Sequence, residues 1–133
     1  MNEQALPTLL IADDDAVVVS MLCSQLAQGF HVVAAARDAE DAIALAHKHQ
    51  PDVAILDVQM PAGGGLRATK EMQTRSPNTA IVVLSADESD GMVRDVIAAG
   101  AIAYVRKGAT TQELSSTLHR AIEAHAMFAQ SVE

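Results

Sequence analysis

Residues 53–65 read VAILDVQMPAGGG, an apolar run that ends in Asp57 and is followed by turn-forming residues. The run Val53–Leu56 shows no alternation of polar and apolar side chains, which favours a strand buried on both faces, as in a parallel sheet. Pro61 and the three glycines after it leave the backbone free to turn before a helix begins. The stretch therefore predicts a central buried strand with one acidic residue at its end.

Four more runs of this kind lie along the chain, and segments with helical spacing separate them. Val18, Leu22 and Leu26 show that spacing in one such segment. Alternating strands and helices joined by right-handed crossovers predict an α/β fold. We expect a single doubly wound, five-stranded parallel sheet in the order 2-1-3-4-5, with helices on both faces as in flavodoxin-like folds. The five predicted strands are Leu9–Ala12, Val32–Ala35, Val53–Leu56, Ala80–Leu84 and Ile102–Val105.

Residues typical of helix ends agree with this division. Asp38 stands where an N-cap is needed, and Thr110 with Glu113 makes a capping box. Gly29 and Gly100 stand where helices should end.

The composition suits one globular domain and excludes several classes of function. Of the 133 residues, 50% are hydrophobic, and we expect one domain over 1–133 with its core from about residue 8 to residue 128. The formal charge of -8 disfavours direct binding to nucleic acid or to anionic membranes. Aromatic residues make up only 2%, so stacking platforms for single-stranded nucleic acid are also missing.

Several observations predict a cytoplasmic location. Cys23 has no partner for an internal disulfide, and its apolar surroundings in sequence suggest a buried thiol in a reducing compartment. No apolar run is long enough for a membrane span, and the first residues, MNEQALP, lack the features of a signal peptide.

Polar residues follow four of the five predicted strands at the point where each strand ends. These residues are Asp13 and Asp14, Asp57, Ser85 and Lys107. Ligands of open α/β sheets bind at the carboxyl ends of the strands, and the four strands concerned are neighbours in the predicted order. We therefore expect the five side chains to line one crevice.

Three carboxylates in one crevice repel one another unless a cation compensates. A small set of oxygen ligands without nearby His or Cys favours Mg²⁺, which keeps several waters and shares its shell with phosphate. Lys107 adds a second positive charge. The crevice thus suits a phosphoryl group, and Asp57 could attack phosphorus to form an acyl phosphate.

Two other phosphate-handling classes fit less well. Gly63, Gly64 and Gly65 lie between a strand and a helix, but the chain has neither a GxGxxG pattern nor a GK[ST] ending there. A phosphatase of the haloacid dehalogenase type would need an acidic residue two positions after the nucleophile, where this chain has Gln59.

From about Leu9 to Phe128 the chain resembles the receiver domains of two-component signalling, in particular chemotaxis-type receivers. The resemblance rests on four segments in order, ADDD at 12–15, DVQMP at 57–61, LSA at 84–86 and YVRKG at 104–108. Each segment alone is weak, whereas the ordered set is highly specific.

The resemblance implies a role for each residue of the crevice. Asp57 would accept the phosphoryl group. Mg²⁺ would be held by Asp14 directly, by Asp13 partly through water, by Asp57, and by the backbone carbonyl of Gln59. Lys107 would contact the phosphoryl oxygens.

The resemblance also implies a conformational switch. Ser85 would move toward the phosphoryl group after transfer, and Tyr104 would change rotamer with it. Such a pair is a two-state element that a new charge biases.

A few positions depart from the family pattern. Gly108 replaces a proline that often follows the lysine, so the loop there should differ. Gly64 replaces a frequent acidic residue, which should affect capping of the third predicted helix. Gln59 and Asp87 occupy variable positions that tune loss of the phosphoryl group, and Asp15 is expected in the first turn of a helix, outside the site.

The resemblance predicts a signalling receiver rather than an enzyme acting on a separate substrate. A sensor histidine kinase or phosphotransfer protein would donate the phosphoryl group, and the receiver would catalyse its own phosphorylation and dephosphorylation. It would then regulate an output domain or a downstream protein partner, without direct contact to nucleic acid or membrane.

Three alternatives remain open from the sequence. A receiver-like module could bind partners constitutively and never carry phosphate. The chain could be the regulatory part of a longer protein. A homodimer could form through the fourth predicted helix, the fifth strand and the fifth helix, although Arg94, Asp95, Arg106 and Glu113 also suit a solvated charged surface.

Overall fold

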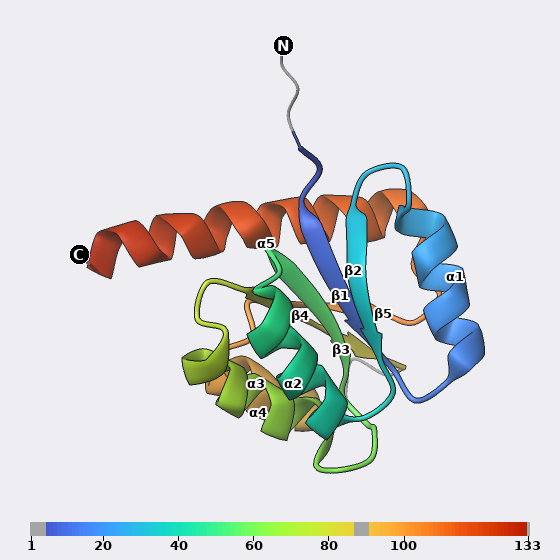
Figure 1. The fold of residues 1–133 in the computed structure, drawn as a ribbon, viewed down its shortest axis with the longest axis horizontal. Helices are drawn as coiled ribbons and strands as arrows, with labels where there is room; N and C mark the ends of the chain where they lie inside the picture. The colour runs from blue at the N-terminus through green and yellow to red at the C-terminus, as the bar shows by residue number, and fades with distance from the viewer. Residues whose placement is uncertain (1–4, 87–90, 133) are drawn as a thin grey trace.

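The computed structural model describes residues 5–86 and 91–132, and in them strands and helices alternate from end to end (Figure 1). All strand pairs are parallel, and the sheet order is β2-β1-β3-β4-β5, as the sequence predicts. The strands are β1 (Thr8–Ala12), β2 (His31–Ala36), β3 (Val53–Asp57), β4 (Ala80–Ser85) and β5 (Ala103–Arg106). The helices are α1 (Ala16–Leu26), α2 (Ala39–His49), α3 (Gly64–Arg75), α4 (Gly91–Ala99) and α5 (Thr111–Val132).

Helices cover both faces of the sheet. Helices α1 and α5 lie on one face, and α2, α3 and α4 lie on the other (Figure 1). Successive residues of β1 point into different cores, Leu9 and Ile11 toward α1 and α5, and Leu10 toward α2 and α3. Apolar side chains are therefore needed at every position of a central strand, which explains the missing alternation in the sequence.

The strand register brings the polar strand ends together. Asp57 pairs with Leu84, so Ser85 lies one residue beyond it on the neighbouring strand. Ala12 pairs with Leu56, and Asp13 follows directly at the end of β1. One edge of the sheet thus gathers side chains that are far apart along the chain.

The predicted helix ends at Asp38, Thr110 and Gly100 are confirmed, whereas α1 ends at Leu26, three residues before Gly29. The side chain of Asp38 accepts a hydrogen bond from Asp41 N at 2.7 Å. Thr110 and Glu113 form the reciprocal capping box, with bonds of 2.9 and 3.1 Å. Gly100 follows α4 with φ +131°, a left-handed conformation in which glycine is favoured.

Two details differ from the sequence prediction. Asp15 is the N-cap of α1, where its Oδ1 accepts from Val17 N at 2.9 Å, because its backbone is extended rather than helical. In β2 the register passes from Val32 to Ala34, which leaves Val33 as an extra residue at this edge of the sheet.

Cys23 is half-buried, less enclosed than its surroundings in sequence suggest. In the described part of the chain, no helix has the combined length and apolar character that a membrane crossing needs.

The last helix, α5, is the longest and extends beyond the sheet (Figure 1). Near this projecting end, His125 Nε2 lies 2.9 Å from the carbonyl oxygen of Pro77, and Met127 and Phe128 are both 69% exposed.

Candidate functional site

Three carboxylates meet at the carboxyl end of the sheet. Asp13 and Asp14 follow β1, and Asp57 is the last residue of β3. Each of the three offers an oxygen, and these oxygens lie within 4.8 Å of one another. Asp13 is fully buried and Asp57 is 3% exposed, whereas Asp14 is exposed. Burial of two acids at this distance concentrates negative charge that a cation must offset.

Asp13 has one satisfied oxygen and one unsatisfied oxygen. Its Oδ1 accepts a hydrogen bond from Asp15 N at 2.9 Å. Its Oδ2 is buried without a hydrogen bond among the described residues and lies 3.4 Å from Lys107 Nζ. A buried carboxylate oxygen of this kind is costly unless a further cation or donor reaches it.

Asp57 has a contact on each of its two oxygens. Gln59 N donates to Oδ1 at 3.2 Å, and Lys107 Nζ donates to Oδ2 at 3.2 Å. Burial raises the pKa of Asp57 to about 6, and the negative charge of Asp13 adds to this, while Gln59 N and Lys107 act in the opposite direction. The carboxyl group is therefore still ionised at neutral pH, but it is more basic than an exposed aspartate.

Lys107 reaches into the crevice from the end of β5. Burial opposes its charge, but the nearby Asp57 and Asp13 outweigh burial, so the pKa of Lys107 is raised. A permanent positive charge thus stands between the two buried acids.

An open crevice of about 560 Å³ is lined by three of these groups, Asp14, Asp57 and Lys107. Ser85, only 3% exposed, lies in its wall, and so do Met60 and Ala86, which are not among the predicted site residues, and Pro61, which is predicted only as part of a turn. Their position in the loops that follow Asp57 and Ser85 is the signal that could have identified them. The crevice is lined by Asp14, Asp57, Val58, Gln59, Met60, Pro61, Ser85, Ala86 and Lys107.

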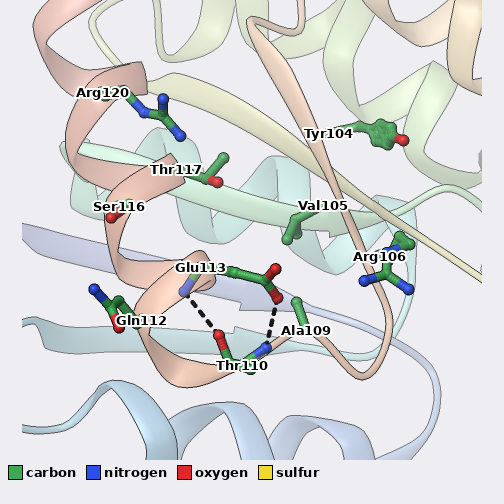
Figure 2. Close-up of a pocket in the computed structure, with 10 residues that line it drawn as sticks. All are labelled: Tyr104, Val105, Arg106, Ala109, Thr110, Gln112, Glu113, Ser116, Thr117 and Arg120. Carbon is green, nitrogen blue, oxygen red and sulfur yellow. Dashed lines mark hydrogen bonds between the residues drawn. The ribbon is translucent and has the colours of Figure 1, made fainter.

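Two predicted site residues do not line this crevice. Asp13 is fully buried beside Asp57 rather than in the crevice wall, which corrects the expectation from the sequence, and the other is Tyr104. It borders a second hollow, about 480 Å³, between β5 and α5 (Figure 2). Its ring points away from the α5 side chains Ser116 and Thr117 (Figure 2). Asp87, the second variable position, lies outside the described residues.

The acid cluster fits Mg²⁺ in ligand type and in spacing. All the candidate ligands are oxygens, which Mg²⁺ prefers. Two oxygens bound directly to Mg²⁺ are at most about 4.2 Å apart, so a spread of 4.8 Å fits direct binding by some of the acids and binding through water by another. The unsatisfied Oδ2 of Asp13 is a group that such a hydrated ion would satisfy.

Backbone geometry explains the two glycines that depart from the family pattern. Gly108, after Lys107, has φ +91°, which a proline ring with φ near -65° cannot adopt. Gly64 opens α3 with φ +67°, and the N-cap before it, Gly63, has no side-chain hydrogen bond. At Gly108 the backbone angle is one that only a residue other than proline can adopt, and at the start of α3 no side chain caps the helix.

Residues 9–119 match the family model of the response regulator receiver domain. Among curated proteins, the response regulator GacA of Pseudomonas aeruginosa is 34% identical over 114 residues, covering 84% of this chain and 53% of GacA. This chain spans about half the length of the curated relatives that it matches.

Solved receiver domains share the fold. The signal receiver domain of the putative response regulator NarL from Mycobacterium tuberculosis matches with a TM-score of 0.85 at 23% identity, over 90% of this chain and 98% of that one. The receiver domain of the sensor histidine kinase PA1611 from Pseudomonas aeruginosa matches with a TM-score of 0.81 at 24% identity, over 90% and 99%. That structure has a magnesium ion coordinated in its active-site cleft.

Proposed function

Because this chain belongs to the response regulator receiver domain family of two-component signalling, we propose that it is a phosphorylation switch with Asp57 as the phosphoacceptor. The observation that carries the proposal is the environment of the Asp57 carboxylate. It is buried at the end of the central strand, contacted by Lys107, and within 4.8 Å of two further carboxylates.

In the proposed reaction, an oxygen of Asp57 attacks the phosphorus of a phosphohistidine on the donor protein. A P–O bond forms as the N–P bond breaks, and the imidazole nitrogen leaves with the bonding electron pair and is protonated by solvent. The attacking carboxylate must be ionised, and a pKa of about 6 leaves it both ionised and nucleophilic at neutral pH. Lys107 is placed to neutralise charge on the transferred group.

Asp13, Asp14, Asp57 and the backbone carbonyl of Gln59 would hold Mg²⁺. When bound, the ion would offset the charge of the phosphoryl oxygens, which is the main requirement of phosphoryl transfer. The fully buried Asp13, with its unsatisfied oxygen, supports this assignment. The magnesium ion in the cleft of the PA1611 receiver supports it further.

The switch would involve Ser85 and Tyr104. Ser85 lies in the wall of the crevice, close enough in the fold to respond to a new charge on the neighbouring strand. Tyr104 lies two residues before Arg106, the register partner of Ser85, and faces the region between the sheet and α4. A change at Ser85 would therefore reach the surface formed by α4, β5 and α5.

The donor would be a histidine kinase or a phosphotransfer protein, and the surface beside the crevice suits such a partner. Helix α1 carries no charged residue, and it exposes Val17 (67%) and Met21 (50%). Met21 also lines an apolar cavity of about 240 Å³ that reaches Lys107, which lines the crevice as well. An apolar surface continuous with the reacting site would hold the donor with its phosphohistidine directed at Asp57.

The phosphorylated receiver would act on an output domain or on a separate protein partner. The hollow between β5 and α5 in Figure 2 lies on the surface that the switch would alter. A homodimer through α4, β5 and α5 stays a prediction for the same surface.

The test is the intact mass of the protein after incubation with acetyl phosphate, with and without Mg²⁺, for the natural chain and for Asp57→Asn. We expect one phosphoryl adduct that requires Mg²⁺ and is absent from the variant. An adduct of equal yield on Asp57→Asn would refute Asp57 as the acceptor. A folded natural chain that gains no adduct would instead favour the constitutive binding module.

A further inference from the structure

The loop between β3 and α3 has a backbone conformation that its own residues do not favour. Ala62, Gly63 and Gly64 are consecutive and all have positive φ, of +69°, +109° and +67°. Ala62 carries a side chain, for which this region is unfavourable. Such a segment persists only where surrounding groups hold it.

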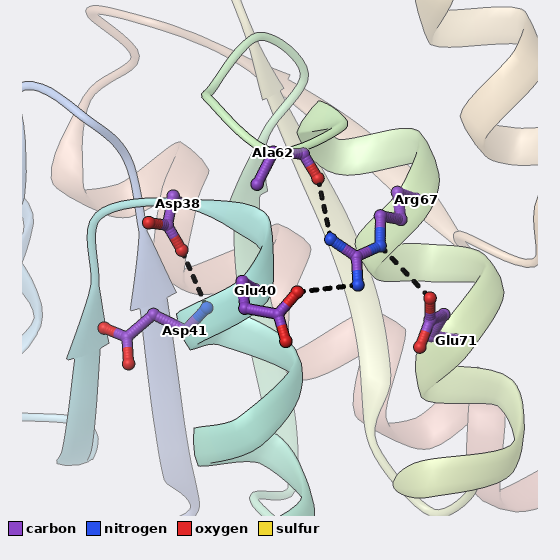
Figure 3. A network of polar contacts seen from close by, with 6 residues as sticks. All are labelled: Asp38, Glu40, Asp41, Ala62, Arg67 and Glu71. Carbon is purple, nitrogen blue, oxygen red and sulfur yellow. Dashed lines mark hydrogen bonds and ion pairs between the residues drawn. The ribbon is translucent and has the colours of Figure 1, made fainter.

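Arg67, from the first turn of α3, is the main group that holds this loop (Figure 3). Its Nη1 donates to the carbonyl oxygen of Ala62 at 3.0 Å. Its Nη2 pairs with Glu40 of α2 at 2.7 Å, and its Nε pairs with Glu71 of α3 at 3.1 Å. One guanidinium thus joins the loop to two helices, which a planar group with several donors can do and a lysine cannot.

The loop leaves room for Arg67 to pass. A Cβ at position 63 would lie 2.7 Å from Cβ and 2.8 Å from Cδ of Arg67, so the side chain runs directly over Gly63. A second tie comes from Ala39 N, which donates to the carbonyl of Pro61 at 3.0 Å. Both ties end on carbonyls of the loop, and both come from helices that stand outside the crevice.

The same loop continues directly into the crevice. Gly64 and Gly65 lie close against the backbone at the end of β3. An added Cβ would lie 2.6 Å from Val58 O at Gly64 and 2.8 Å from Asp57 O at Gly65. Gln59 lies between these contacts and Ala62, and its N–H donates to Asp57. The position of the loop therefore sets the position of the Gln59 backbone.

We propose that Arg67 is a positioning residue for the metal site, acting through the carbonyl of Ala62 to fix the loop that presents the Gln59 carbonyl. This inference rests on the proposed function, because it takes the crevice to be the Mg²⁺ site. Arg67 itself does not line the crevice, so its effect is on ligand geometry rather than on direct contact with the ion or the phosphoryl group.

The test is the Mg²⁺ dissociation constant, measured by titrating MgCl₂ into the ¹⁵N-labelled protein and following backbone amide signals by NMR. Arg67→Gln should weaken Mg²⁺ binding by about tenfold, the low end of the effect of changing groups that orient metal ligands. Arg67→Lys should recover only part of the affinity, because an ammonium group cannot reach Ala62 and both carboxylates together.

Arg75→Gln is the matched control. It removes the same charge from the same helix, and the side chain of Arg75 is exposed. It should leave the Mg²⁺ affinity unchanged. Thermal unfolding of each variant shows that the proteins compared are folded, and Arg67→Lys serves as the test if Arg67→Gln does not fold.

Each outcome separates this inference from the proposed function. An unchanged Mg²⁺ affinity in a folded Arg67 variant would overturn the positioning role and leave the proposed function intact. Equal weakening by Arg75→Gln would show a charge effect and would also overturn it. If the natural chain shows no titration with Mg²⁺, the metal site and the role of Arg67 both fall.

Discussion

Two loops border the crevice at Asp57, and both pass through left-handed backbone, but only one of them is enclosed. In the loop from β3 to α3, an added Cβ at Gly64 would collide with Val58 O. In the loop from β5 to α5, Gly108 has φ +91° and nothing within 4 Å of an added Cβ. Glycine is thus needed for space and for conformation in the first loop, and for conformation alone in the second.

The two loops also differ in the hydrogen bonds that hold them, and again the first loop is the more constrained. Arg67 and Ala39 hold the first loop from neighbouring helices. The second loop is fixed mainly at its ends, by Lys107 N to Ser85 O at 2.9 Å and by the capping box at Thr110. In the proposed function, the first loop would hold the Gln59 carbonyl in place as a metal ligand, and the second would let the Lys107 side chain adjust to the arriving phosphoryl group.

The largest expected effect is on stability and contrasts the two glycines directly. Gly64→Ala should lower the free energy of unfolding by about 3 kcal/mol or more, because it adds a collision with backbone to the cost of positive φ. Gly108→Ala should cost only about 1 kcal/mol, from conformation alone. Urea unfolding of both variants measures the difference. Equal losses would show that enclosure does not distinguish the loops.

The next effect concerns the side chain that the open loop carries. Lys107→Met should slow phosphorylation by acetyl phosphate by about a hundredfold, because it removes the positive charge next to Asp57. Lys70→Met is the control, since it removes the same charge from the exposed surface of α3. The measurement is the initial rate of adduct formation by mass spectrometry. A rate equal to that of the control would show that Lys107 takes no part in phosphoryl transfer.

A third effect tests the buried acid between the two loops. The raised pKa of Asp57, about 6 against 3.8, means that the metal-free folded protein holds this proton more tightly than the unfolded chain does. The resulting stabilisation is complete below about pH 4 and is lost as the pH rises through about 6. Asp57→Asn carries no such charge, so it should be the more stable protein at pH 7.5, by up to about 3 kcal/mol.

The measurement for this third prediction is the difference in unfolding free energy between the natural chain and Asp57→Asn, with EDTA present, at several pH values. The gap should widen from pH 4 to pH 7.5. A gap that stays constant with pH would contradict the raised pKa of Asp57.

The smallest expected effect lies at the far end of the open loop. Thr110→Ala removes the N-cap bond to Glu113 N and should cost about 1 kcal/mol of stability, as N-cap deletions usually do. Thr110→Ser keeps the hydroxyl and should retain most of the stability. Thermal unfolding compares the two, and equal losses would show that the cap contributes little.

Much of the fold and of the crevice could be predicted from the sequence, because the pattern within each short segment is enough to identify the strands. Each central strand needs apolar side chains on both faces, so Val53–Leu56 and Ala80–Leu84 are visible without a structure. Once parallel strands are predicted, their carboxyl ends must meet, and this places Asp57 beside Ser85 and Lys107.

What the sequence could not predict depends on how separate elements pack. Arg67 contacts Glu40 only because α2 lies against α3, and the contact with Ala62 requires positive φ at a residue that rarely adopts it. The sequence also does not separate an N-cap from a first-turn residue at Asp15, because the two differ only in local backbone angles. The hollow that Tyr104 borders against α5 also depends on how a helix and a strand pack, and the sequence alone does not show it.

Because α5 is long, a small movement of the loop between β5 and α5 would be amplified at the far end of the helix. At about 1.5 Å per residue, its 22 residues form a rod of about 33 Å that begins at the capping box, three residues after Lys107. A tilt of about 5° at the capping box would displace the far end of such a rod by about 3 Å. The exposed Met127 and Phe128 near that end would therefore move several times farther than any atom of the loop, so a small change of angle at the crevice would become a large displacement at the end of α5.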